Sequence, residues 1–293
     1  MSNYKKKVLI TGGLGFVGYN LVKRLQETTD YEISVIDNLA SASSSTKNMV
    51  TDVNYFIDDI NNINSDKYNK LKFDLIFHLA ALARIQPSFK DPKSYFQSNV
   101  MGTVNICEFA RKIGAKIVYA ASSSAYGGPK LNPYSFTKYT GEEILKMYSD
   151  IYDVSTVSTR FFNVYGDRQP TTGEYATIIG IFERQFKNNE KLTITGDGEQ
   201  RRDFTHVNDI CDGLICLSND THTGEVYNLG TGVNYSINEI AAMFSDNIKY
   251  IPARPGEART TLADISATQK FGYQPKQNIT NYIYSFKGIS NEA

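Results

Sequence analysis

The chain has 293 residues, with 31 Lys and Arg balanced by 31 Asp and Glu, so its formal net charge is 0. That length suits one large core or one domain with a smaller second unit, and the neutral balance offers no basic surface for nucleic acid. No apolar run reaches membrane length, and the amino terminus passes directly into a predicted strand. We therefore expect neither a membrane anchor nor a leader segment.

Cysteine and histidine usage argues against a disulfide framework or a metal site. Cys107, Cys211 and Cys216 lie in helical patterns without C-x-x-C spacing, which favours a reducing, cytoplasmic setting. The histidines show no ligand spacing, so we expect no metal. His78, at the end of a predicted strand, is interpreted as structural rather than catalytic.

Strand and helix patterns alternate along most of the chain. Segments of this kind predict an α/β fold with a doubly wound parallel (Rossmann) sheet and right-handed crossovers. In such sheets ligands bind at the carboxyl ends of the strands, near the point where the strand order reverses. The predicted strands are 7–11, 32–36, 53–57, 73–79, 116–120, 155–161 and 226–229.

The first predicted strand runs into a glycine-rich loop and then into a helical pattern. Gly12, Gly15 and Gly18 permit a tight turn, close approach of a pyrophosphate and close packing of helix on strand. The helix N-terminus offers free N–H groups to phosphates. The second strand ends at Asp37, which can accept both ribose hydroxyls and would repel the extra phosphate of NADP. The pattern predicts NAD as the cofactor.

A candidate catalytic group follows the fifth predicted strand. Tyr134 and Lys138 are four residues apart, so in a helix they share one face, and Ser122 stands twelve residues before the tyrosine. A phenol with a pKa near about 10 is a poor base at neutral pH, and a nearby ammonium favours the phenolate. The three residues therefore predict a tyrosine base, although an exposed Tyr–Lys pair gives the same spacing.

These motifs resemble the extended short-chain dehydrogenases/reductases, specifically the nucleotide-sugar epimerases and dehydratases, and are closest to UDP-glucose and UDP-N-acetylglucosamine 4-epimerases. The resemblance covers nearly the whole chain. It is carried by residues 12–18, 37–38, 59–60, 78–81, 99–103, 122–127, 134–138, 160–166, 196–204 and 254–257.

The resemblance implies an NAD site and a mechanism. Tyr134 takes the proton of the sugar 4-hydroxyl while hydride leaves C4, Lys138 lowers the tyrosine pKa and binds the nicotinamide ribose, and Ser122 holds the same sugar oxygen. The implied cofactor-binding residues are Gly12, Gly15, Phe16, Val17, Gly18, Asp37, Asn38, Asp59, Ile60, Leu79, Ala80, Ala81, Asn99, Tyr134, Lys138 and Phe161.

Ser123 and Ser124 separate the possible reactions within the family. Related dehydratases carry Asp-Glu at these positions and sugar-acid decarboxylases a glutamate in this loop, whereas two serines provide no carboxyl for eliminating water. The pair therefore favours 4-epimerisation of a UDP-hexose through a transient 4-keto sugar. A 4,6-dehydratase, another sugar-nucleotide epimerase and a catalytically silent NAD-binding sensor remain alternatives.

The resemblance also implies a substrate site. Arg202 and Arg254 match diphosphate-binding arginines, as arginine suits planar phosphate recognition, and Asn163 matches an asparagine at the diphosphate or sugar. Glu257 matches an acid that holds the nucleotide ribose. The remaining substrate-binding candidates are Ser123, Ser124, Thr193, Thr195 and Thr261.

Two of these positions depart from the usual family pattern. An aromatic residue commonly stands where Thr195 does, and its loss removes a stacking face for uracil. Thr261 stands where strict UDP-glucose enzymes carry a bulky tyrosine, so we hypothesise room for an acetamido group at C2. The loop 127–133 is shorter than in most relatives, which predicts a more open sugar pocket.

Domain organisation and assembly are further expectations. We assign 1–162 and 203–229 to the NAD-binding domain and 163–202 and 230–293 to the nucleotide-sugar domain. The resemblance implies a homodimer through a four-helix interface of the helices near 93–112 and 135–149. The candidate contacts, which would equally suit a core-facing stripe, are Ile106, Phe109, Ile144 and Met147.

Overall fold

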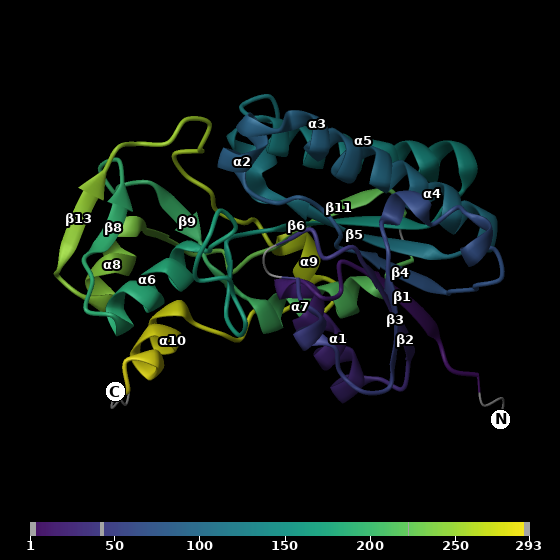
Figure 1. The fold of residues 1–293 in the computed structure, drawn as a ribbon, viewed down its shortest axis with the longest axis horizontal. Helices are drawn as coiled ribbons and strands as arrows, with labels where there is room; N and C mark the ends of the chain where they lie inside the picture. The colour runs from purple at the N-terminus through teal and green to yellow at the C-terminus, as the bar shows by residue number, and fades with distance from the viewer. Residues whose placement is uncertain (1–3, 42–43, 222, 290–293) are drawn as a thin grey trace.

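The computed structural model describes residues 4–41, 44–221 and 223–289, and its centre is one seven-stranded parallel sheet (Figure 1). The strand order is β11-β6-β5-β4-β1-β2-β3, which reverses between β1 and β4 and confirms the predicted doubly wound sheet. The strands are β1 (Lys7–Thr11), β2 (Glu32–Asp37), β3 (Val53–Ile57), β4 (Leu75–His78), β5 (Lys116–Ser122), β6 (Thr156–Phe161) and β11 (Glu225–Leu229).

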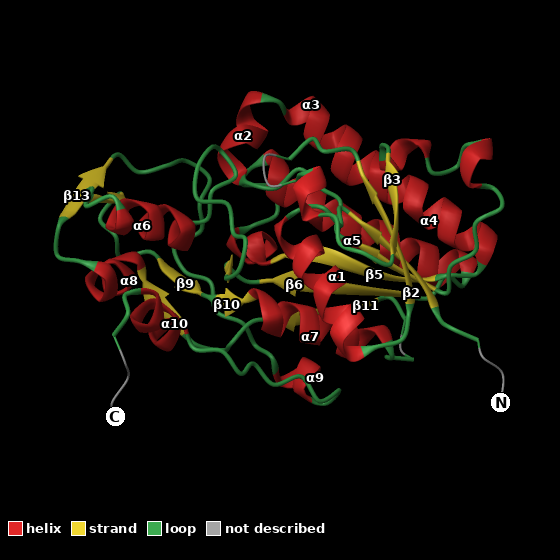
Figure 2. Cartoon of the chain, turned by 60° about the horizontal axis from the view of Figure 1, so that its bottom comes forward, coloured by secondary structure: helices red, strands yellow, loops and turns green. Residues whose placement is uncertain are grey.

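Helices cover both faces of this sheet, so alternate strand residues enter two separate cores (Figure 2). Val8 and Ile10 face α1 (Phe16–Thr28) and α7 (Val207–Ser218). Leu9 points the opposite way and belongs to the core that includes Ile106 of α4 (Gly102–Ile113) and Leu145 of α5 (Pro133–Tyr152). Near-continuous apolar strands are what burial on both faces requires.

Short helical elements connect the strands to these helices. The helical run before α4 consists of α3 (Pro92–Tyr95) and a π-helical stretch, η4 (Phe96–Met101), so the two predicted helices near 93–112 and 135–149 are both present. The other short elements are η1 (Thr46–Asn48), η2 (Ile60–Asn62), η3 (Asp66–Tyr68), α2 (Ile85–Lys90) and η5 (Ser123–Gly127).

A smaller unit lies at the carboxyl end of the sheet and has its own core, which includes Phe182, Ile194, Phe244 and Ile283. Two strand pairs support it, β8 with β13 in parallel and β9 with β12 antiparallel. Its elements are α6 (Ile178–Lys187), β8 (Leu192–Thr195), β9 (Arg201–Asp203), β12 (Asn234–Ser236), α8 (Ile237–Phe244), β13 (Ile248–Ile251) and α10 (Ile279–Phe286). A short pair, β7 (Val164–Tyr165) with β10 (Thr205–His206), joins it to the large sheet.

One segment assigned to the small unit from sequence packs instead against the large one. Tyr273 is buried in the core beneath β11, with Ile265 and Phe271 beside it. The short helix α9 (Ser266–Gln269) carries Thr268, whose hydroxyl donates to the carbonyl of Asn228 at 2.8 Å. The segment around α9 therefore packs against the large sheet, although the residues on either side of it pack in the smaller unit.

The structure can also be searched for membrane-spanning helices, disulfide bonds and metal-binding groups. None of the helices in this part of the chain is long and apolar enough to cross a membrane. Cys107, Cys211 and Cys216 are free thiols. Within the described ranges, no group of three or more His, Cys, Asp or Glu is positioned to hold a metal ion.

Candidate active site

A cleft of about 720 Å³ lies where the carboxyl ends of the strands meet the smaller unit. Its floor includes Gly12 after β1, Ala80 after β4, Ser122 at the end of β5 and Phe161 at the end of β6. The opposite wall comes from the smaller unit and from residues 254–261. This is the crevice at the reversal of strand order, where open parallel sheets bind their ligands.

The glycine loop brings backbone directly to the wall of the cleft. Gly12 has a φ of 71°, and a Cβ there would lie 2.9 Å from the Cα of Ala80. A Cβ on Gly18 would overlap the carbonyl of Gly12, so α1 can approach β1 this closely only without a side chain. The loop is a cradle that exposes N–H groups at the start of α1, as an incoming pyrophosphate requires.

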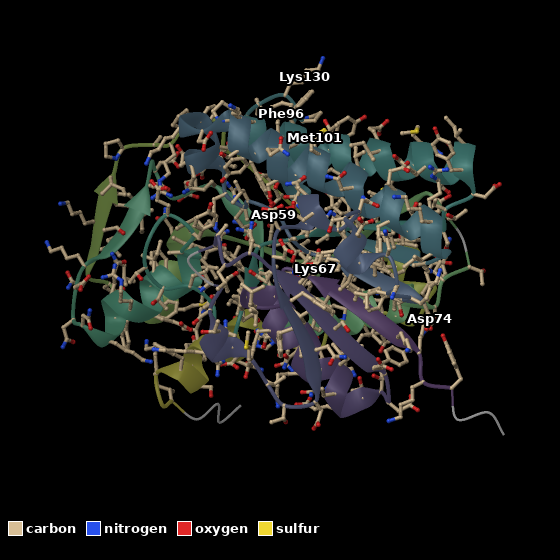
Figure 3. All side chains as sticks on the ribbon, turned by 45° about the vertical axis from the view of Figure 1, so that its right-hand side comes forward. Asp59, Lys67, Asp74, Phe96, Met101 and Lys130 are labelled. Atoms are coloured by element: carbon tan, nitrogen blue, oxygen red, sulfur yellow. The ribbon has the colours of Figure 1, made fainter. Side chains whose placement is uncertain are left out.

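Asp37 and Asp59 close the end of the cleft beyond β2 and β3. The Asp37 carboxylate accepts from the N–H of Leu14 at 3.0 Å and of Leu39 at 2.8 Å, which ties it to the glycine loop. Burial raises the pKa of Asp37, and these two N–H groups act in the opposite direction. Asn38 donates to Asp59 at 2.7 Å (Figure 3 labels Asp59).

The start of α5 positions the candidate base. Asn132 caps the helix by accepting from the N–H of Ser135 at 2.7 Å, and Pro133 occupies the first helical position. Tyr134 therefore stands in the first turn, beside Ser122 at the end of β5. Burial raises the pKa of Tyr134, whereas a hydrogen bond with the Ser122 hydroxyl and the charge of Arg84 lower it.

Lys138 lies one turn further along the same face and is almost fully buried. Its Nζ donates to the carbonyl of Ala120 at 2.7 Å. Burial lowers the pKa of Lys138 to about 7, and the carboxylate of Glu142 acts in the opposite direction. Arg84 contributes to lowering the pKa of Tyr134, whereas the Lys138 ammonium is turned to the end of β5.

His78 is structural, as predicted. The ring is completely buried between β1 and α4, with Nδ1 2.8 Å from the Thr11 hydroxyl and Nε2 3.1 Å from the Thr103 hydroxyl. Burial lowers the pKa of His78 to about 3, so the ring is neutral at physiological pH.

The substrate candidates line the opposite wall of the cleft. Arg202, on β9, pairs with Glu257 at 3.7 Å. Arg254 is exposed and lines the same cleft. Asn163 after β6 and Thr195 at the end of β8 line it too. The arginines interpreted as solvated or salt-bridged do pair away from it, Arg201 with Glu239 and Arg259 with Asp197.

Two hydroxyls in the cleft have no hydrogen-bond partner among the described residues. These are Oγ of Ser124 and Oγ1 of Thr261, and both atoms are buried. A buried hydroxyl without a partner carries a desolvation cost, so both are available to a bound ligand.

The chain matches the model of the NAD-dependent epimerase/dehydratase family over residues 8–230. It is 31% identical to the UDP-glucose 4-epimerase of Mycolicibacterium smegmatis, over 92% of this chain and 94% of that protein. The chain belongs to the NAD-dependent epimerase/dehydratase family.

Solved structures of other epimerases show the same fold. The UDP-N-acetylglucosamine 4-epimerase of Methanobrevibacter ruminantium, in complex with UDP-N-acetylmuramic acid, is 30% identical with a TM-score of 0.86, covering 97% of this chain and 96% of that one. The UDP-glucuronic acid 4-epimerase of Bacillus cereus, in complex with UDP-glucuronic acid and NAD, is 28% identical with a TM-score of 0.87, covering 96% and 98%.

NAD is the cofactor of this family, and the residues present fit it. The glycine loop leaves room for the pyrophosphate because its glycines have no Cβ atoms, and the Asp37 carboxylate lies at the end of this loop. Of the sequence-predicted cofactor residues, those that line the cleft are Gly12, Gly15, Phe16, Val17, Gly18, Asp37, Asn38, Asp59, Ile60, Leu79, Ala80, Ala81, Tyr134, Lys138 and Phe161.

Two predicted ligand residues do not reach the cleft. Asn99 is buried, and its side chain bonds the backbone of Leu82 and the hydroxyl of Thr137. It therefore fixes the loop after β4 instead of contacting a ligand. Thr193 exchanges hydrogen bonds with Gln185 of α6, two residues before Thr195 at the cleft end of the strand. We correct both assignments on this geometry.

Sequence reasoning missed several cleft residues, among them three with polar side chains near the sugar end. Arg84 and Gln86 lie in the loop and short helix after β4, and Tyr175 lies before α6. An arginine a few residues beyond His78-Leu-Ala-Ala81 at a strand end was the available signal. Tyr175 and Gln86 had none, since their positions depend on how the smaller unit sits over the sheet.

Proposed function

We propose that the protein is an NAD-dependent 4-epimerase of a UDP-hexose, with UDP-glucose and UDP-galactose as the simplest substrate pair. One observation carries this proposal: Tyr134 and Ser122 face the cleft with Ser123 and Ser124 beside them and no carboxylate. The carboxylates in the described lining are held elsewhere: Asp37 by the glycine loop, Asp58 by Lys67, Asp59 by Asn38, Glu174 by Lys90 and Glu257 by Arg202.

The chain's own residues perform the proton chemistry. Tyr134 as phenolate takes the proton of the sugar 4-hydroxyl at its Oη and later returns it, while Ser122 keeps that oxygen in place by hydrogen bonding. NAD, when bound, accepts the C4 hydride and gives it back. Between these steps the 4-keto sugar turns about its diphosphate, which Arg202 and Arg254 hold from the opposite wall.

Product analysis in D₂O tests the proposal against its alternatives. The protein is incubated with NAD and UDP-glucose, and proton NMR follows the sugar. We expect UDP-galactose with protium kept at every carbon, because the hydride leaves and returns without exchange. A 4-keto-6-deoxy sugar carrying solvent deuterium would identify a 4,6-dehydratase. Tight NAD binding without turnover of any UDP-sugar would favour the silent sensor.

The sugar itself is a finer part of the proposal. We infer that C2-acetamido sugars are accepted, because Thr261 is smaller than the tyrosine expected in strict UDP-glucose enzymes, and its hydroxyl and that of Ser124 have no partner among the described residues. Conversion of UDP-GlcNAc and UDP-glucose is measured side by side. Thr261→Tyr is expected to abolish turnover of the acetylated sugar alone, and Thr260→Tyr, on the exposed side of the same segment, to change neither rate. Brisk turnover of UDP-glucose with none of UDP-GlcNAc in the wild type contradicts this inference.

We also propose a homodimer through η4, α4 and α5. Of the predicted contacts, Ile106 and Phe109 are buried in the core, and Ile144 packs against it, whereas Met147 is exposed. Exposed apolar side chains on the same helices support an interface: Phe96, Met101 and Phe136 (Figure 3 labels Phe96 and Met101). A Met101→Lys variant that sediments like the wild type would argue against it.

The compartment and the division into two domains stay proposals as well. Three free thiols favour a reducing setting such as the cytoplasm. The separate core of the smaller unit supports the domain limits proposed from sequence, with the segment around α9 as the exception.

A further inference from the structure

Arg84 is a cation at the sugar end of the cleft to which the proposed reaction assigns no contact with the substrate. It precedes α2 and lines the cleft together with Tyr134 and Ser122. Tyr95 joins it to the candidate base: its hydroxyl donates to the carbonyl of Arg84 at 3.0 Å, and its ring meets the Tyr134 ring edge-on at 6.3 Å. The guanidinium is close enough to Tyr134 to lower its pKa.

The guanidinium has no acidic partner among the described residues. Its Nε donates to the carbonyl of Tyr175 at 3.0 Å, which holds the side chain in place. Neither terminal nitrogen has a hydrogen-bond or ion-pair partner in the described part of the chain, and Arg84 lines the cleft. Glu174 also lines the cleft, but its carboxylate pairs with Lys90. A half-buried cation without a counter-charge is costly, and a bound anion removes that cost.

The backbone of Arg84 adopts a strained conformation, which points to a functional role for this residue. Its φ is 94° and ψ is 140°, a region that residues with a Cβ rarely adopt. Such a conformation carries a steric cost, and residues that adopt it are concentrated at active sites and ligand-binding positions. A glycine would hold this turn without strain, so the cost is associated with presenting the arginine side chain.

We propose that Arg84 is a specificity-determining residue that binds a carboxylate at C6 of the sugar, so that the preferred substrate is an acidic UDP-hexose. This inference rests on the proposed 4-epimerase function. C6 is attached to C5, the ring neighbour of C4, so a cation beside the base that takes the 4-hydroxyl proton also lies near C6. The planar fork of arginine matches the two oxygens of a carboxylate.

Other anions in the complex have their own partners. The substrate diphosphate has Arg202 and Arg254 on the opposite wall, and the cofactor pyrophosphate has the glycine cradle. The Tyr134 phenolate accepts from Ser122 and makes no hydrogen bond with Arg84. A sugar carboxylate is therefore the group that uses both terminal nitrogens.

The test compares UDP-glucuronic acid with UDP-glucose, which differ only in the oxidation of C6. Steady-state constants are measured with the NAD-loaded wild type and with Arg84→Gln, Arg84→Gly and Arg259→Gln. Arg84→Gly removes the side chain while relieving the backbone, so it is expected to fold at least as well as the wild type. Arg259, exposed and paired with Asp197, is the matched control.

We expect the wild type to favour the acidic sugar in kcat/KM. Both Arg84 variants should lose about 10- to 100-fold on UDP-glucuronic acid beyond any loss that they show on UDP-glucose, as for a hydrogen bond to a charged group. An equal loss on both sugars, or a shifted pH profile with an unchanged ratio of the two, overturns the proposal in favour of a role on Tyr134.

Binding separates this inference from the proposed function. Dissociation constants of both nucleotides are measured by calorimetry on NAD-loaded Tyr134→Phe protein with and without Arg84→Gly. Failure of the wild type to epimerise either sugar refutes the proposed function. A preference for UDP-glucuronic acid that disappears with Arg84→Gly still supports the carboxylate site, and equal affinities overturn it.

Discussion

The cofactor end and the sugar end of the same cleft are built in different ways. The cofactor end uses backbone, because the glycine loop and the ends of β1, β2 and β4 are placed by the sheet itself. The sugar end uses side chains from separate segments: Arg84, Ser122, Asn163, Arg202, Arg254 and Thr261. Cofactor binding therefore follows from the fold, whereas the substrate depends on residues that can change without disturbing it.

Removal of the phenol is expected to have the largest effect and to fall on the sugar end alone. Tyr134→Phe should lower kcat by about 10²- to 10⁴-fold, the usual contribution of a positioned general base, while the protein keeps its NAD. Tyr139→Phe on the same helix is the control and should retain activity. Initial rates and bound NAD are measured on both proteins, and unchanged turnover in Tyr134→Phe would refute the assignment of the base.

The cofactor end should be most sensitive to an added methyl group. Gly18→Ala places a Cβ against the carbonyl of Gly12, so we expect a loss of up to about 3 kcal/mol in unfolding free energy and a low NAD content. Gly114→Ala has a φ of 73° but open space around the Cβ, and should cost only about 1–2 kcal/mol with normal NAD content. Urea unfolding and absorbance of bound cofactor provide both readouts. Full NAD occupancy in Gly18→Ala would contradict a backbone-built cofactor end.

Arg202 should act on the substrate and leave the cofactor alone. Arg202→Leu is expected to raise KM for the UDP-sugar by about 10- to 100-fold, the value of a charge-assisted hydrogen bond to phosphate. Arg259→Leu removes an exposed arginine that pairs with Asp197 and should leave KM unchanged. If both variants behave alike, Arg202 is a surface charge and not a diphosphate ligand.

The remaining prediction concerns the pH dependence of stability. The pKa of Lys138 is about 7 in the folded protein against 10.5 in the unfolded chain, so between these values the unfolded state binds more protons. Stability therefore gains up to about 1.4 kcal/mol per pH unit from this group as the pH rises above 7. Lys138→Met lacks the gain, and its stability relative to the wild type should fall from pH 7 to pH 9.

Urea unfolding at several pH values measures this difference. Lys90→Met, which removes an exposed lysine, should keep the wild-type slope. Parallel curves for Lys138→Met and the wild type would mean that the Lys138 ammonium stays charged in the folded protein throughout this range.

Sequence alone reached most of the cleft because its strongest signals are local. The glycine loop, Asp37 at the end of β2 and the Tyr134–Lys138 spacing each lie within one segment, where strand and helix geometry determine the placement. The assignments that failed depend on which way a side chain turns. Thr193 faces α6, and Asn99 holds the loop after β4.

What the sequence determined by itself is the parallel sheet, the NAD end of the cleft and the place of Tyr134 at the start of a helix, since periodicity and short motifs encode them. Only the tertiary structure decided that Arg84 lines the cleft with Tyr134, without an acid partner among the described residues, and that Lys138 turns to the carbonyl of Ala120. The reason is physical: contacts between segments distant in the chain depend on packing and on the pairing of buried charges, which no local pattern records.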